Sequence, residues 1–323
     1  DLAKFKVYYT IELNEVATHI FESNDFEVKL CSHNDEETYV KELAEFQPDA
    51  IMCRTEPITA KMMDTCKNLK VIGKQGAGLD NIDMDHAHAK DITVVYAPAG
   101  NANAVAEHAV MLMLMCAKRF TYVDRQFRGG NFLVRMGMEH TYELGGKTLG
   151  MIGCGRISQL AMQKCKYGFG MNVIGYDPYL TQDKIGDLCE LKATAKEVWE
   201  QADFVSVHLP VVPSTEHSIG REQFSWMKPT ASFINCARGA LIKENELVEC
   251  LKDGTLFQAG LDVFEHEPIQ ESSRELFNLD NVIMTPHMAA TTEQSVLNCC
   301  TSVANDIVAV CNGQEPKIGR AHV

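Results

Sequence analysis

Short apolar runs alternate with helical patterns through the first hundred residues. Five runs rich in Val, Ile and Tyr are predicted to be strands, at residues 6–9, 27–31, 50–53, 70–72 and 92–96. Between them, segments such as 37–45 and 60–67 carry apolar residues at helical spacing. Strand and helix in alternation favour a parallel sheet with crossover helices.

The same alternation resumes in the second half of the chain. Six further strands are predicted at residues 148–152, 172–176, 204–208, 232–236, 259–263 and 282–284. A chain of 323 residues is too long for one core and suits two domains. We therefore expect an α/β protein with two related, doubly wound parallel sheets.

Two long helical segments flank this second half. Residues 103–120 are apolar on most sides and rich in Ala, Met and Leu, which predicts a buried helix linking the domains. Glycine pairs at 129–130 and 145–146 then bracket an arm that we expect to be irregular. Residues 292–311 are amphipathic enough to form a helix that packs back onto the first domain.

Composition narrows the class of protein. The formal charge of −14 argues against nucleic-acid binding, and no apolar run approaches the roughly 20 residues needed to span a bilayer. The twelve cysteines are scattered without a Cys-x-x-Cys pair, which predicts no metal site and favours reduced thiols in a cytoplasmic protein. The first ten residues show no secretory signal, although a processed precursor stays open because the chain does not begin with Met.

A glycine loop follows the strand predicted at 148–152. Gly153 allows a tight turn, and Gly155 lets the backbone approach a pyrophosphate at the next helix N-terminus. Ser158 stands at the position of the third glycine, and two glycines alone would also suit an ordinary turn. Asp177 ends the next strand, where an acid can accept both ribose hydroxyls and repel a 2′-phosphate. Together these features predict binding of NAD.

Three charged side chains lie just beyond predicted strands, where parallel sheets bind ligands. Arg238, Glu267 and His287 each follow one of three successive strands. Taken singly, they are equally explained by a surface ion pair, a solvated loop and a structural histidine. Jointly they fit one reaction.

That reaction is the reduction of a 2-oxo acid by a hydride from nicotinamide. The planar guanidinium of Arg238 can hold the carboxylate and carbonyl in a fork. His287 can supply the proton, and Glu267 can orient the imidazole and keep it protonated. His108, His208 and His266 have no comparable setting for catalysis and are interpreted as structural or solvated.

These residues lie in motifs that resemble those of the D-isomer specific 2-hydroxyacid dehydrogenases. The resemblance covers nearly the whole chain and is clearest from Gly73 to Thr292. The similar segments are residues 76–83 in the substrate-carboxylate loop, 105–107 in the interdomain helix, 235–239 in the arginine motif, 262–268 in the acid motif and 286–287 in the histidine motif. In the acid motif the Glu before Pro is the catalytic partner, which implies Glu267 rather than Glu265.

The resemblance also implies the binding residues. Asp262 would contact the nicotinamide amide, Thr215 the pyrophosphate, and the backbone amides after Gln75 the substrate acid. The expected cofactor-binding residues are Gly153, Gly155, Arg156, Ile157, Asp177, His208, Pro210, Thr215, Cys236, Ala237, Asp262, His287 and Ala289. The expected substrate-binding residues are Arg54, Gln75, Gly76, Ala77, Gly78, Asn101 and Arg238.

The family fold implies two Rossmann-like domains with an active-site cleft between them. Residues 1–100 and 289–323 would form a flavodoxin-like substrate domain, and residues 101–288 the NAD-binding domain, around which a homodimer would assemble. The departures, Ser158 for glycine and Val212 for a common Thr, leave the catalytic group intact. Because the chain ends at Val323, we expect no regulatory domain of the kind found in some phosphoglycerate dehydrogenases.

Two alternatives and the choice of acid stay open. Formate dehydrogenases share the architecture but carry Gln where Glu267 stands. NAD-binding corepressors of the family keep the catalytic group and have a region similar to residues 176–179, but usually carry disordered tails. Glyoxylate, hydroxypyruvate, phosphohydroxypyruvate and longer 2-oxo acids are all candidate substrates.

Two positions bear on the substrate. Phosphoglycerate dehydrogenases resemble this chain in Asn101 and in an arginine near Arg54, which could bind a phosphate, although a solvated arginine explains Arg54 equally well. Gly100 stands where D-lactate dehydrogenases tend to carry tyrosine, which would leave space beside the substrate. We therefore expect hydroxypyruvate or its phosphate rather than pyruvate.

Overall fold

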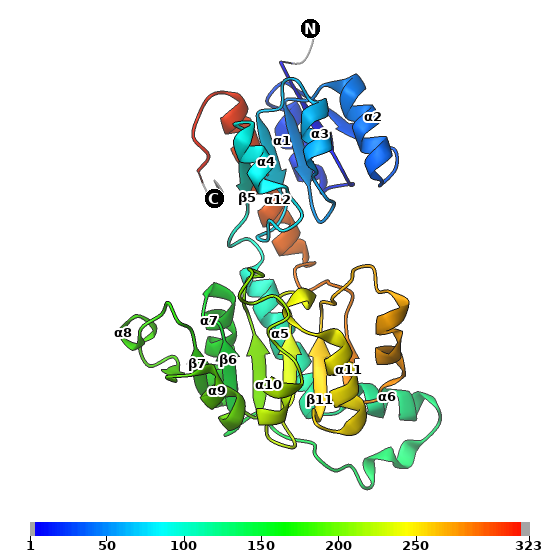
Figure 1. Cartoon of the computed structure of the whole chain (residues 1–323), viewed down its shortest axis with the longest axis vertical. Helices are drawn as coiled ribbons and strands as arrows, with labels where there is room; N and C mark the ends of the chain where they lie inside the picture. Colours follow the sequence, from blue (N-terminus) through cyan, green and yellow to red (C-terminus); the bar gives the residue numbers. More distant parts are fainter. Residues whose placement is uncertain (1–3, 318–323) are drawn as a thin grey trace. The chain divides into compact units, whose positions relative to one another are not determined.

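The computed structural model describes residues 4–317, which fold into two compact units (Figure 1). Unit 1 comprises Asp1–Asn101 and Ala290–Val323, and unit 2 comprises Ala102–Ala289. Each unit is built on its own parallel sheet flanked by helices. The predicted α/β class with two doubly wound parallel sheets is confirmed.

The sheet of unit 1 has five strands in the order β2-β1-β3-β4-β5. Its strands are β1 (Phe5–Tyr9), β2 (Phe26–Leu30), β3 (Ala50–Cys53), β4 (Val71–Lys74) and β5 (Thr93–Tyr96). Its helices are α1 (Glu15–Glu22), α2 (Glu36–Phe46), α3 (Ala60–Thr65), α4 (Met84–Ala89) and α12 (Glu293–Cys311). All pairings between these strands are parallel, as the crossover helices require.

Helix α12 completes the core of unit 1 although it comes from the far end of the chain (Figure 1). Cys300, Val303 and Ile307 are fully buried and pack with Val7 and Val71 of the sheet. Thr292 caps the start of the helix by accepting a hydrogen bond from the Ser295 N–H. The amphipathic pattern of residues 292–311 therefore reflects burial against this sheet.

The sheet of unit 2 has seven parallel strands in the order β12-β11-β10-β9-β6-β7-β8. They are β6 (Thr148–Ile152), β7 (Asn172–Tyr176), β8 (Glu190–Leu191), β9 (Phe204–Val207), β10 (Ser232–Asn235), β11 (Gln258–Leu261) and β12 (Val282–Met284). The order of the strands reverses between β6 and β9, and the carboxyl ends of strands at such a switch point form a ligand-binding crevice. The cofactor and catalytic motifs lie at this edge.

The helices of unit 2 cover both faces of its sheet. They are α5 (Ala102–Ala117), α6 (Phe120–Arg128), α7 (Arg156–Gln163), α8 (Gln182–Ile185), α9 (Ala195–Gln201), α10 (Arg221–Trp226) and α11 (Glu244–Asp253). Short 3-10 helices are η1 (Phe132–Arg135), η3 (Gly239–Leu241) and η4 (Glu271–Asn278), and a π-helical turn is η2 (Lys164–Gly168). Trp199, Phe224 and Phe233 form a buried aromatic cluster between α9, α10 and the sheet.

Three local features differ from the sequence prediction. The helix expected over residues 103–120 ends at Ala117, and a second helix, α6, begins at Phe120 after Arg119, which takes a left-handed conformation (φ 50°). The arm expected to be irregular contains η1. Strand β8 was not predicted, since a strand of two residues carries no periodicity. Within residues 4–317, no helix has the length and apolar character needed to cross a membrane.

Candidate active site

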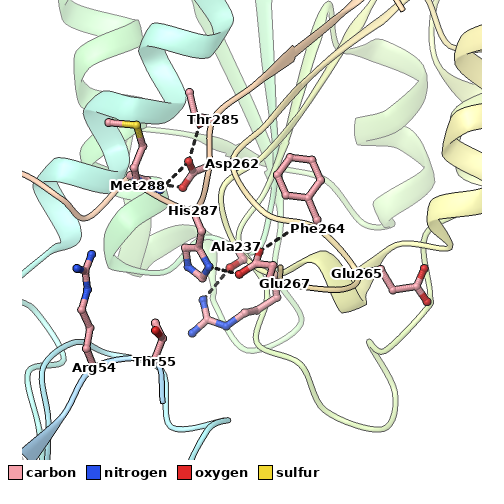
Figure 2. A network of polar contacts seen from close by, with 12 residues as sticks. Arg54, Thr55, Ala237, Asp262, Phe264, Glu265, Glu267, Thr285, His287 and Met288 are labelled. Carbon is pink, nitrogen blue, oxygen red and sulfur yellow. Dashed lines mark hydrogen bonds and ion pairs between the residues drawn. The ribbon is translucent and has the colours of Figure 1, made fainter. Parts of the chain in front are cut away.

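Three neighbouring strands carry the proposed catalytic side chains. Strands β10, β11 and β12 are adjacent in the sheet and end level with one another, since Asn235 pairs with Leu261 and Leu261 with Met284. Arg238, Glu267 and His287 follow these three strands. The parallel register therefore brings residues separated by about fifty positions to one edge of unit 2 (Figure 2).

The buried side chain of Asn235 shapes the turn that carries Arg238. Its Oδ1 accepts the Ala237 N–H at 2.9 Å, and its Nδ2 donates to the Arg238 carbonyl at 3.0 Å. The Arg238 guanidinium donates to the Ala237 carbonyl at 2.7 Å. The side chain of Arg238 is half-buried.

Gly239 joins the arginine turn to the acid segment. A Cβ atom on Gly239 would lie 1.9 Å from the carbonyl of Phe264 and 2.4 Å from the Glu265 nitrogen. The two backbones are thus in direct contact, and any side chain at position 239 would separate them. Arg238 and Glu267 are held in one assembly for this reason.

Glu267 and His287 form a close pair. His287 Nδ1 lies 2.5 Å from Glu267 Oε2, and Glu267 Oε1 accepts the Phe264 N–H at 3.0 Å (Figure 2). Burial alone would raise the pKa of Glu267, but the hydrogen bonds from His287 and Phe264 and the nearby Arg238 charge hold that pKa below its usual value. Glu265 instead pairs with His217, at 2.8 Å.

Asp262 forms several hydrogen bonds to the segment that carries His287. Its fully buried carboxylate accepts the N–H groups of Met288 and Ala289, both at 2.9 Å, and its carbonyl accepts the His287 N–H at 2.7 Å. These bonds hold His287 in a left-handed backbone conformation (φ 49°), which non-glycine residues rarely adopt. Asp262 therefore has a positioning role besides the nicotinamide contact that the family resemblance implies.

His108 also belongs to this network. From the sequence alone it was interpreted as a structural or solvated histidine. Its Nε2 lies 2.8 Å from Thr285 Oγ1, and that hydroxyl donates to Asp262 Oδ1 at 2.5 Å. Because the hydroxyl proton goes to Asp262, His108 Nε2 must carry the proton of the first bond. No sequence signal marks this contact, since His108 lies in α5, far along the chain from Thr285.

The glycine loop and Asp177 form one structure at the other side of the switch point. Gly153 (φ 87°) makes the tight turn after β6, and a Cβ there would lie 2.5 Å from the His208 carbonyl oxygen. Asp177 Oδ2 accepts the Cys154 N–H at 2.9 Å and so ties the end of β7 to the loop. Ser158 adds a bond that glycine could not, because its buried hydroxyl donates to the Gly153 carbonyl at 2.6 Å.

The loop fits a bound dinucleotide. Gly155 is exposed and a Cβ there would meet no atom within 4 Å, so the space in front of α7 is open to a phosphate. No side chain caps the N-terminus of α7, whose free N–H groups can bind an anion. At the neighbouring strand end, His208 Nδ1 is buried and has no partner within the described part of the chain.

The remaining cofactor candidates lie at the same edge of unit 2. Arg156 and Ile157 begin α7, Pro210 and Thr215 follow β9, and Cys236, Ala237 and Ala289 follow β10 and β12. The Thr215 hydroxyl is already engaged, because it donates to the Pro210 carbonyl at 2.6 Å and accepts the Val212 N–H at 2.9 Å. It shapes its own loop in this way.

Most of the expected substrate-binding residues belong to unit 1. Gln75, Gly76, Ala77 and Gly78 follow β4, and Gly76 has φ 141°. The loop is anchored by the Gln75 N–H on the Cys53 carbonyl at 2.8 Å and the Ala97 N–H on the Gly76 carbonyl at 2.9 Å. At the end of this unit, Asn101 Oδ1 is buried without a hydrogen-bond partner among residues 4–317.

Arg54 is held in place rather than freely solvated. Its N–H donates to the buried Glu56 carboxylate at 2.9 Å, and its carbonyl accepts a hydrogen bond from the buried Lys74 ammonium. Its guanidinium donates to Thr291 Oγ1 at 3.0 Å. The backbone N–H and the backbone carbonyl of Arg54 are therefore both fixed by charged side chains.

The interpretation of Gly100 is wrong. A Cβ on Gly100 would lie 2.6 Å from Cys299 Sγ of α12, so the missing side chain makes room for that helix. Gly100 therefore gives no argument about substrate size. For metals, no group of three His, Cys, Asp or Glu side chains among the described residues is arranged to hold an ion.

Comparison with known proteins identifies the family. The model of the D-isomer specific 2-hydroxyacid dehydrogenase NAD-binding domain matches residues 110–289. D-3-phosphoglycerate dehydrogenase of Methanocaldococcus jannaschii is 39% identical over 96% of this chain, which spans 58% of that protein's length. Hydroxypyruvate reductase of Thermotoga maritima is 36% identical over 91% of this chain and 94% of its own length.

A solved structure supports the same assignment. D-lactate dehydrogenase of Aquifex aeolicus, complexed with NAD and lactic acid, superposes with a TM-score of 0.82 at 26% identity and covers 95% of this chain and 96% of its own. The family resemblance drawn from the motifs and the prediction of NAD binding are confirmed. The chain belongs to the D-isomer specific 2-hydroxyacid dehydrogenase family and contains that family's NAD-binding domain.

Proposed function

We propose that the protein interconverts a 2-oxo acid and its D-2-hydroxy acid with NAD(H). When bound, the nicotinamide supplies or accepts the hydride. Arg238 holds the carboxylate and the carbonyl of the acid, and its planar guanidinium polarises the carbonyl as charge develops on oxygen. His287 donates the proton to that oxygen from Nε2, because its Nδ1 is bound to Glu267.

The observation that carries this proposal is the His287–Glu267 pair beside Arg238. A carboxylate bonded to Nδ1 fixes the direction of the ring and leaves Nε2 as the nitrogen that exchanges the proton with the substrate. Both side chains are about one-third exposed, with 37% for His287 and 35% for Glu267, so the pair is open to a small molecule.

Turnover of a substrate panel tests the activity. NADH oxidation is measured with glyoxylate, pyruvate, hydroxypyruvate, phosphohydroxypyruvate and a branched 2-oxo acid. We expect turnover with at least one, and a preference for NADH over NADPH of at least about tenfold, because the Asp177 carboxylate repels a 2′-phosphate. NADH binding without turnover of any acid would favour the corepressor-like alternative.

We further propose hydroxypyruvate or its phosphate as the substrate. Two relatives are named D-3-phosphoglycerate dehydrogenase and hydroxypyruvate reductase, and Arg54 offers a cation whose backbone is held by Glu56 and Lys74. Arg54→Ala is expected to raise the KM for the phosphorylated acid at least about tenfold and to leave glyoxylate nearly unchanged. Thr291→Val is the matched control, because it removes the partner of Arg54 and keeps the guanidinium. Equal effects on both acids would refute this role of Arg54.

We propose a homodimer built on unit 2. The arm formed by α6 and η1 exposes five large apolar side chains, each about half exposed or more: Phe120, Phe127, Phe132, Leu133 and Met136. Such a concentration on one short segment is typical of a surface that a partner covers. We also propose a cytoplasmic location, since all twelve cysteines are free thiols.

A further inference from the structure

Two buried thiols meet beneath the nucleotide loop of unit 2. Cys154 lies between the loop glycines Gly153 and Gly155, and Cys189 directly precedes the edge strand β8. A Cβ on Gly175 would lie 2.7 Å from Cys154 Sγ and 2.9 Å from Cys189 Sγ. The two sulfurs thus share the space above Gly175 and are hydrogen-bonded to each other.

One member of the pair is tied to the ribose-binding acid. The Cys154 N–H donates to Asp177 Oδ2 at 2.9 Å, so a shift of Cys154 moves the contact between the loop and Asp177. Cys299 and Cys300 are neighbours in the sequence, but their thiols do not face each other, because consecutive residues of a helix point in different directions. They provide an internal comparison.

The surroundings favour a reactive thiolate on Cys189. The hydrogen bond from Cys154 lowers the pKa of Cys189, and the ammonium groups of Lys166 and Lys192 act in the same direction, against the effects of burial and of the Glu190 carboxylate. The same bond, burial and the Asp177 charge raise the pKa of Cys154. Lys166 also donates a hydrogen bond to the Asp187 carbonyl in the turn before Cys189, which places a positive charge near this thiol, so we take Cys189 as the nucleophile of the pair.

A small oxidant can reach Cys189 through local opening. Strand β8 has two residues, pairs with β7 alone and forms the edge of the sheet. The turn before it is exposed at Gly186 and Asp187. Edge segments with so few contacts open far more readily than the core.

We propose that Cys154 and Cys189 form a redox-active dithiol that a hydroperoxide oxidises to a disulfide, which weakens NAD(H) binding. The Cys189 thiolate attacks the peroxide, the O–O bond breaks, and a sulfenic acid and an alcohol (water from hydrogen peroxide) form after one proton is taken up. The Cys154 sulfur then attacks the Cys189 sulfur, the S–O bond breaks, and hydroxide leaves with the Cys154 proton as water. Two thiols are oxidised and one peroxide is reduced.

The disulfide changes the nucleotide loop by geometry. Its sulfurs lie about 2.0 Å apart, closer than hydrogen-bonded thiols, so Cys154 moves toward Cys189 across Gly175. The Cys154–Asp177 bond and the turn at Gly153 are distorted together. The expected loss of affinity for NAD(H) depends on NAD(H) binding at this loop. Formation of the disulfide does not depend on the proposed dehydrogenase activity.

The test treats the reduced protein with a slight excess of hydrogen peroxide. Thiol titration under denaturing conditions is expected to fall by two from the twelve thiols, and peptide mapping to find a Cys154–Cys189 link. NADH binding, followed by fluorescence, is expected to weaken about tenfold, equivalent to about 1.4 kcal/mol, and to recover with dithiothreitol.

Matched variants separate this pair from other thiols. Cys189→Ser is expected to abolish both the link and the oxidation-dependent loss of affinity, with Cys189→Ala as a second variant if the serine protein does not fold. Cys299→Ser is expected to respond as the unmodified protein does. The proposal is overturned if other cysteines become oxidised but the Cys154–Cys189 link does not form. It is also overturned if protein that carries the link binds NADH with unchanged affinity. Turnover of the reduced protein reports separately on the dehydrogenase activity.

Discussion

At the scale of single residues, His287 stands out because its backbone and its ring are both constrained. The backbone is held at positive φ by Asp262, and the ring is held by Glu267. A left-handed conformation costs a non-glycine residue of order 1 kcal/mol or more, so the network around Asp262 must offset that cost. The backbone conformation of His287 thus lowers the stability of the fold, while the direction of its ring is fixed.

Substitutions of this pair should separate chemistry from cofactor binding. His287→Ala is expected to lower turnover by roughly two to four powers of ten, because the proton donor is lost, while NADH still binds. Glu267→Gln is expected to lower turnover less than His287→Ala does, because the ring loses the carboxylate that fixes its direction but keeps its proton-donating nitrogen. Stopped-flow turnover across pH and NADH titration measure both effects. Near-normal turnover of His287→Ala would contradict the assignment.

His208 predicts a pH dependence of stability. Burial lowers its pKa to about 4, whereas an unfolded histidine titrates near 6.5. Between these values the unfolded chain binds the proton and the folded chain does not, so this group reduces stability as pH falls from about 6.5 toward 4.

Replacing the imidazole should remove that dependence. In His208→Gln, the decrease in unfolding free energy between pH 7 and pH 4.5 is expected to be smaller by on the order of 2 kcal/mol, given about 1.4 kcal/mol per pKa unit. Urea unfolding at several pH values measures it, and the difference should vanish above pH 7.5 or so. A variant that loses stability in parallel with the parent protein at every pH would argue against a neutral His208.

At the scale of elements, the junction of β10 and β11 depends on one glycine. Gly239→Ala would place a methyl group within the Phe264–Glu265 backbone. We expect destabilisation on the order of 3 kcal/mol, and a loss of turnover that exceeds the loss of NADH affinity. Gly168→Ala is the control, because a Cβ there meets no atom within 4 Å. Thermal unfolding and turnover of both variants give the comparison; equal behaviour would show that the two segments can separate.

Elements with strong periodicity were predictable, and short or distant contacts were not. The eleven predicted strands all correspond to observed strands, because each buries a run of apolar side chains. Strand β8 and the break at Arg119 left no such pattern. The proposed catalytic residues could be picked out because each follows a strand, whereas the contacts of His108 and Cys189 exist only in the folded sheet.

At the scale of the whole molecule, the apolar arm predicts the oligomeric state. If the proposed dimer forms, Leu133→Asp combined with Phe132→Ser should convert it into a monomer, because both side chains are more than 60% exposed and have no role in the core of unit 2. Sedimentation velocity measures the change, with Glu139→Gln in the same arm as the control. A parent protein that sediments as a monomer would rule out the proposed dimer.

The position of α12 has a consequence for how the chain is made. The five strands of unit 1 are synthesised before unit 2, yet Cys300, Val303 and Ile307 of its core come after unit 2 in the chain. All of unit 2 is synthesised between them, and domains fold as units during synthesis. Until α12 has been synthesised, one apolar face of the sheet of unit 1 stays uncovered while unit 2 forms. On a translating ribosome, the sheet of unit 1 therefore completes its core only after unit 2 has been made, and during that interval it is a target for chaperones.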